Sequence, residues 1–196
     1  MRPVLILIGC LTLLTSACGK KAESPEDQKP PLNQLIKEDV RTRARGVLQP
    51  VKVKLKKALT TAISETGPEG AVEACRIKAP AITAGANQKL IKLGRSAARL
   101  RNPKNAPADW LKPVIEKYAT GPAASGAYEV IPISGRRYGY VEPIYTGHLC
   151  TTCHGDRVSS VVRAAIAEGY PEDKAMGFKP GQFRGVFWVE MHESVL

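Results

Sequence analysis

The chain has 196 residues, a formal net charge of +11, and 43% hydrophobic and 6% aromatic residues. This length fits one domain plus an export segment, and the hydrophobic content argues against a wholly disordered chain. The positive charge fits an acidic partner protein, an anionic membrane surface or an ordinary solvated surface. Because no nucleic-acid-binding motif accompanies the charge, we expect no nucleic-acid partner.

The N-terminus predicts export. Residues 4–14 form an apolar run that is too short to span a bilayer and follows the positive Arg2, as in a signal peptide. The small residues before Cys18 resemble a bacterial lipobox, so we predict a signal peptide over 1–17 and lipidation of Cys18. Residues 18–33 are charged and proline-containing, which predicts a flexible tether. Gly19 after the cysteine favours the periplasmic side of the outer membrane; a soluble periplasmic protein is the alternative.

Residues 35–63 carry apolar side chains at helical spacing, and we expect an interruption or kink near Pro50. The segment 66–69 is a helix start, with proline in the first turn and an acidic residue near the positive end of the dipole. In the helix that follows, Cys75 shares one face with Ala71 and Ala79. Pro80 is expected to bend or interrupt that helix.

The remaining segments predict a mixed fold. We expect strands over 90–100 and 183–191, a short helix capped by Asp109, and a helix over 158–168 that ends at Gly169. Residues 128–133 and 137–144 flank a Ser134-Gly135 turn and predict a β-hairpin. Helices beside an antiparallel sheet, with few parallel crossovers, indicate an α+β domain over 34–196.

The most informative motif is Cys150-Thr151-Thr152-Cys153-His154, whose C-x-x-C-H spacing is typical of covalent haem c attachment. The two thiols can form thioethers with the two haem vinyl groups, and His154 then lies below the iron as an axial ligand. A zinc site would need a second ligand pair, which the sequence lacks. A thioredoxin-like pair would need a preceding strand in a βαβ unit, which the pattern does not predict.

Counting cysteines isolates Cys75. Cys10 leaves with the signal peptide, Cys18 is predicted to carry lipid, and Cys150 and Cys153 are predicted to hold haem. Cys75 then has no disulfide partner in an oxidising compartment. It is either a buried inert thiol or the second axial ligand of the iron, where small neighbours would let a flat macrocycle approach.

Other residues compete for the second axial position. Met176 lies in a loop-like stretch before Gly177, and methionine is a common ligand in cytochromes c. His148 is too close to the motif to reach the far face easily, and Met191 and His192 end a strand. A five-coordinate iron is a further alternative. By charge alone, the candidates for the haem propionates are Arg95, Arg99, Arg101, Arg136 and Arg137.

Several motifs occur together in a fixed order. They are AVEAC (71–75), AP (79–80), GRS (94–96), RNPKNAP (101–107) with Trp110, CTTCHG (150–155), YPEDKAMG (170–177) and GQFRG (181–185). In this combination the chain resembles, over roughly residues 35–191, a bacterial and cyanobacterial family long described as a domain of unknown function. The resemblance implies a PAS-like antiparallel sheet flanked by helices and one covalent haem c. It also implies His154 and Cys75 as the iron ligands.

These features favour an exported mono-haem cytochrome c that carries single electrons. The alternative is a haem-based redox or gas sensor that acts through a separate partner. An enzyme such as a peroxidase is not expected, because His148 and His192 are poorly placed for acid–base work. The redox partner is not identifiable from the sequence. A lipid anchor would hold the protein at the membrane, and a homodimer is possible.

Overall fold

The computed structural model describes residues 33–121, 124 and 126–196. All elements below belong to one compact unit that spans residues 32–196. The predicted signal peptide, Cys18 and all of the predicted tether except Asn33 lie outside the described residues. Within the described ranges, no helix is both long enough and apolar enough to cross a membrane.

Helix α1 (Gln34–Ala84) is the longest element, and the Asn33 side chain caps its N-terminus by accepting from Leu35 N at 3.0 Å. Neither Pro50 nor Pro80 interrupts α1, which runs through both, so an interruption at these positions is wrong. A proline inside a helix costs about 3 kcal/mol, and burial of Leu48 and Val51 around Pro50 offsets that cost. Non-helical backbone occurs in α1 at Gly67 (φ 73°, ψ 173°), where the sequence predicts a new helix start.

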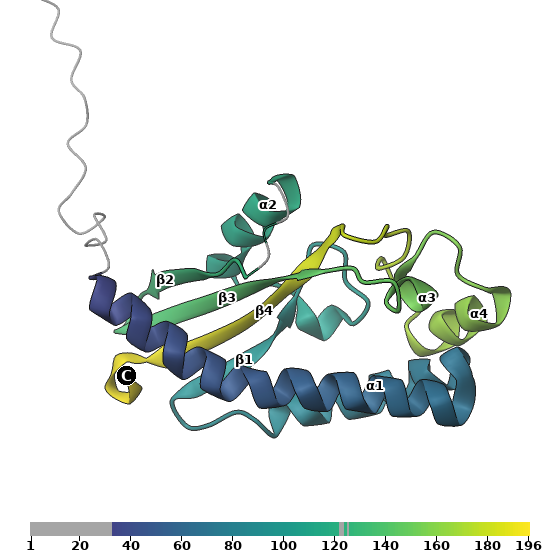
Figure 1. Ribbon diagram of the computed structural model, residues 1–196, viewed down its shortest axis with the longest axis horizontal. Helices are drawn as coiled ribbons and strands as arrows, with labels where there is room; N and C mark the ends of the chain where they lie inside the picture. Colours follow the sequence, from purple (N-terminus) through teal and green to yellow (C-terminus); the bar gives the residue numbers. More distant parts are fainter. Residues whose placement is uncertain (1–32, 122–123, 125) are drawn as a thin grey trace, which may run out of the picture. The chain divides into compact units, whose positions relative to one another are not determined.

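Four antiparallel strands form one sheet: β1 (Ile91–Ser96), β2 (Glu129–Ile133), β3 (Arg137–Tyr145) and β4 (Phe183–His192). Their spatial order is β1-β4-β3-β2 (Figure 1). The predicted hairpin is confirmed as β2 and β3, and the last strand pairs with both β1 and β3. The α+β prediction is therefore confirmed.

Alternate residues of each strand face opposite sides of the sheet, and a helix packs on each side. On one side α1 contributes Val40, Ala44, Leu48 and Val51 to a core with Ile91, Leu93, Tyr140, Val189 and Met191. On the other side, η2 (Asp109–Leu111) and α2 (Lys112–Thr120) pack Leu111, Val114, Ile115 and Tyr118 against Val141 and Val186. A further turn, η1 (Pro103–Asn105), connects β1 to this second layer.

A third cluster lies at the end of the sheet where β3 leaves it. There, α3 (Thr151–His154) and α4 (Ser160–Gly169) lie beside the second half of α1 (Figure 1). Val72 of α1 packs with Val158, Val162 and Ile166, and Cys153, Tyr170 and Met176 lie against them. The chain closes with η3 (Glu193–Val195). This packing brings the region of Cys75 to the predicted haem motif.

Candidate functional site

The C-x-x-C-H motif forms a single helical turn. Cys150 is the N-cap residue of α3, and its carbonyl oxygen accepts from His154 N at 2.9 Å and from Cys153 N at 3.3 Å. Both thiols are free and half-buried. Burial raises the pKa of Cys153, the charge of Arg101 partly opposes that rise, and charges on Cys75 and Cys150 add to it. The turn therefore presents two neighbouring thiols and places His154 directly after them.

The His154 ring has a defined orientation. Its Nδ1 atom lies 2.6 Å from the carbonyl oxygen of Ala175. A carbonyl only accepts, so Nδ1 carries the proton and Nε2 keeps its lone pair. Burial, with the charges of Arg101 and Arg184, lowers the pKa of His154 to about 3. The ring is therefore a neutral imidazole with one nitrogen free to bind a metal, the form that metal sites use.

Cys75 lies near this turn, although it is far away in the sequence. The thiol is half-buried, and burial raises its pKa while the charges of Arg95 and Arg101 partly oppose that rise. A charge on Cys75 in turn raises the pKa of Cys153. The fold therefore brings Cys75 together with the predicted haem motif.

Arg101 joins the motif to the segment that follows α4. Its Nη2 atom donates to the Cys153 carbonyl at 2.6 Å, and its Nε lies 3.1 Å from Asp173 Oδ1. The two side chains are largely buried, at 13% and 4% exposed. Asp173 Oδ1 also accepts from Ala175 N at 3.0 Å. This network positions the carbonyl that accepts from His154.

Positive charge accumulates around the motif. Arg95 and Arg184 are half-buried, and burial lowers the pKa of both, that of Arg184 to about 10. The charges of Arg101 and Arg95 also lower the pKa of Arg184, so these guanidinium groups lie near one another. The buried Nε of Arg184 has no hydrogen-bond partner among the described residues. Such a cluster suits an anionic group.

The arginines predicted from charge alone divide into two groups. Arg95, Arg99 and Arg101 lie near the motif. Arg136 and Arg137 instead pair with Glu193 and Glu190, in the β2–β3 turn and the adjoining start of β3. Sequence reasoning missed Arg184 and Asp173. Arg184 could have been found as a cation shortly before the apolar run 186–189 of the last strand, whereas the role of Asp173 has no local sequence signal.

The competing ligand candidates occupy different places in the fold. Met176 directly follows Ala175, whose carbonyl faces Nδ1 of His154, and its side chain packs in the same cluster as Cys153. His148 is exposed on the turn before α3, and Met191 is fully buried in the sheet core. The Nδ1 atom of His192 accepts from Ser194 N at 3.2 Å at the C-terminal end of the sheet.

Comparison with known proteins identifies a family. A solved structure described as the cyanobacterial heme-protein Tll0287 matches with a TM-score of 0.56 and 21% sequence identity, covering 83% of this chain and 98% of that one. At this identity the likeness supports the fold. No curated protein matches the chain. The family model described as Tll0287-like matches residues 24–191, so its match begins within the predicted tether. The match spans most of the chain, which therefore belongs to the Tll0287-like family.

Proposed function

We propose that the chain binds one haem covalently through Cys150 and Cys153, with His154 as an axial ligand of the iron. The observation that carries this proposal is the 2.6 Å contact between His154 Nδ1 and the Ala175 carbonyl oxygen. It leaves Nε2 of a neutral imidazole available, directly after two thiols at the spacing that haem attachment requires. The solved relative is itself described as a heme-protein.

The surrounding residues fit such a group. Haem carries two propionates, and the described residues near the motif hold more positive than negative charge. Among the described residues, Arg95 and Arg184 form no ion pair with a carboxylate, whereas Arg101 is paired with Asp173. Arg95 is therefore the strongest candidate for a propionate contact.

Cys75 is our candidate for the second axial ligand. It lies near Cys153, and Met176 follows the residue on the Nδ1 side of His154. Burial raises the pKa of the free Cys75 thiol, so the thiolate needs a cation to stabilise it. Iron in a bound haem supplies that charge, together with one-electron chemistry. A thiolate donates electron density and favours ferric iron, so we expect a lower reduction potential than with histidine and methionine.

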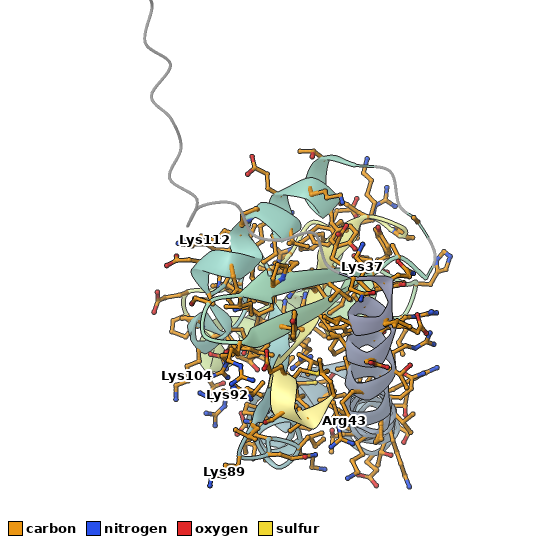
Figure 2. All side chains as sticks on the ribbon, turned by 90° about the vertical axis from the view of Figure 1, so that its left-hand side faces the viewer. Lys37, Arg43, Lys89, Lys92, Lys104 and Lys112 are labelled. Atoms are coloured by element: carbon orange, nitrogen blue, oxygen red, sulfur yellow. The ribbon has the colours of Figure 1, made fainter. Side chains whose placement is uncertain are left out.

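The most economical function is therefore single-electron transfer by an exported, lipid-anchored cytochrome, without an enzymatic activity of its own. Two protein-derived ligands would leave no open position for a substrate. Exposed cations suit an acidic redox partner. Figure 2 shows Lys37 and Arg43 on α1, and Lys89 and Lys92 near β1, projecting away from the ribbon. We also propose that the protein forms a homodimer, which a measurement of its molecular mass in solution would test.

A sensor is the second candidate, and one observation favours it. Because burial raises the pKa of Cys75, protonation of the thiol would compete with iron binding at that residue. Loss of that ligand on reduction would open a position for carbon monoxide or nitric oxide. Carbon monoxide binding to the reduced wild-type protein would favour the sensor; a reduced spectrum unchanged by the gas would favour the carrier.

The test is expression with a cytochrome c maturation system, followed by pyridine haemochrome and electron paramagnetic resonance spectra. We expect one haem per chain and a low-spin ferric signal typical of thiolate ligation. Cys75→Ser should remove that signal while haem stays attached. Met176→Leu is the matched control and should leave the signal unchanged. A chain without covalent haem would contradict the proposal, and a signal that follows Met176 would exclude Cys75.

The predicted anchor is tested separately. Cys18→Ser should move the protein from the membrane fraction to the soluble periplasmic fraction. Cys75→Ser is the control because it removes a different cysteine, and it should remain in the membrane fraction. Wild-type protein in the soluble fraction would instead support plain secretion.

A further inference from the structure

A cavity of about 330 Å³ opens beside the candidate haem site, between the C-terminal end of α2, the adjoining ends of β3 and β4, and the loop before β4. Its walls combine aromatic rings with cations. The rings belong to Tyr118, Tyr145, Phe178 and Phe183, and the cations are Arg99 and Arg184. This volume lies at the lower end of the range of about 300–1,000 Å³ for small-molecule sites.

Neither cation of the cavity forms an ion pair with a described acidic residue. Arg99 Nε donates to the Lys174 carbonyl at 3.0 Å, its Nη2 donates to the Met176 carbonyl, and its guanidinium carbon lies 4.1 Å from the Phe178 ring centroid. Arg184 Nη1 donates to the Arg99 carbonyl at 3.2 Å. Carbonyl oxygens carry no full charge, and no aspartate or glutamate is among the described lining residues. The cavity therefore favours an anion.

One residue of the cavity wall, Tyr118, has a buried hydroxyl without a described partner. Tyr118 is only 8% exposed, and its hydroxyl has no hydrogen-bond partner among the described residues. Burial raises the pKa of Tyr118 to about 12, so the hydroxyl remains a donor at neutral pH. The hydroxyl itself is inaccessible to solvent, so Tyr118 contributes its ring to the cavity wall, 6.0 Å from the Phe183 ring, centroid to centroid.

We propose that this cavity is a second ligand site, which binds a small aromatic carboxylate. The carboxylate would meet Arg184 and Arg99, and the ring would lie among the aromatic walls. The site is distinct from the Cys75–His154 region because α2 and β3 contribute Tyr118 and Tyr145 to it. Arg184 is the shared element, since its charge also acts on His154. The proposal does not require that haem be bound.

The first test is calorimetric titration of the purified full-length, haem-loaded protein with benzoate, and with neutral benzamide as the matched probe. We expect benzoate to bind at least about tenfold more tightly than benzamide, because only benzoate forms charge-assisted hydrogen bonds. Arg184→Gln should weaken benzoate binding by a similar factor. Arg136→Gln removes a cation in the distant β2–β3 turn and should bind like the wild type.

Ala119 lines the cavity and is exposed on α2. Ala119→Trp would therefore place a large side chain in the cavity without disturbing the packing of the core. It should abolish benzoate binding. Equal binding of benzoate and benzamide, no binding of either, or binding unchanged by Ala119→Trp would each overturn the proposal.

A third experiment tests whether benzoate binds at a site separate from the one that the haem propionates occupy. A Cys150→Ala/Cys153→Ala chain cannot attach haem covalently, and its absorbance spectrum reports any haem that it retains. Benzoate binding to both the haem-loaded and the haem-free protein supports a separate site. Binding to the haem-free protein alone would mean that the propionates occupy the cavity, and the second-site proposal would fail while the haem proposal stands.

Discussion

His154 Nδ1 and the Ala175 carbonyl oxygen lie 2.6 Å apart, and this contact connects the haem motif to the segment after α4. Arg101 holds the same segment in place, because its guanidinium donates hydrogen bonds to the Asp173 carboxylate and to the Cys153 carbonyl. The backbone adds a further bond, from Phe178 N to the His154 carbonyl at 2.8 Å. The orientation of the proposed iron ligand therefore depends on Ala175, 21 positions away, and on the residues that hold its segment in place.

The burial of His154 predicts a pH dependence in the haem-free chain. Because the folded state holds the pKa near 3, below the ordinary 6.5, the unfolded chain takes up the proton first as the pH falls. The free energy of unfolding should therefore decrease between about pH 6.5 and pH 3. Urea unfolding of the Cys150→Ala/Cys153→Ala chain measures this slope. His154→Gln should flatten it, whereas replacing the exposed His148 by glutamine should not; equal slopes in all three would contradict the burial argument.

Asp173→Asn should destabilise the fold strongly. The Asp173 side chain is 4% exposed and its partner Arg101 is 13% exposed, so the substitution leaves a buried guanidinium without its counter-charge. Breaking such a pair costs about 3–5 kcal/mol. Asp109→Asn is the matched control: it breaks the exposed pair with Lys112, which solvent screens, and should change the free energy of unfolding far less. Chemical unfolding measures both, and similar losses would show that burial is not the cause.

Gly94→Ala should destabilise the sheet through Trp188. A Cβ atom at position 94 would lie 2.6 Å from the indole of Trp188, which is opposite it in the β1–β4 register. Overpacking of this kind costs about 1–3 kcal/mol. Gly46→Ala, on α1, meets no atom within 4 Å and should stabilise by roughly 0.5–1 kcal/mol through helix propensity. Thermal unfolding distinguishes the two, and a stabilising Gly94→Ala would refute the contact.

Gly67 positions the half of α1 that carries Cys75. Its φ of 73° and ψ of 173° belong to a region that is essentially restricted to glycine, and strain there costs about 1–3 kcal/mol. Gly67→Ala should lower stability by that amount and, in the haem-loaded protein, should alter the ferric low-spin spectrum. Gly46→Ala again serves as the control, because it leaves the direction of the helix unchanged. An unaltered spectrum would mean that Cys75 does not depend on this break.

Local sequence patterns predicted several elements of the fold and the haem motif. The hairpin, the last strand and the helix start at Gly67 depend on neighbours within a few residues, which is why the sequence by itself predicts them. The same holds for the turn from Cys150 to His154, whose spacing alone indicates haem attachment. The Pro50 interruption was wrong because packing of Leu48 and Val51 outweighs a local preference that is worth only a few kcal/mol.

The tertiary structure decided the surroundings of the motif. Three features join residues from α1, β4 and the segment after α4. They are the approach of Cys75 to Cys153, the contact of the Ala175 carbonyl with His154, and the arginine cluster that contains Arg184. No sequence spacing encodes such contacts, because they depend on strand register and on how α1 packs against α4. Judged by charge alone, Arg136, Arg137 and Arg95 were equal candidates for the haem propionates. Only the folded chain shows that Arg136 and Arg137 form ion pairs near the β2–β3 turn, whereas Arg95 lies beside the predicted haem motif.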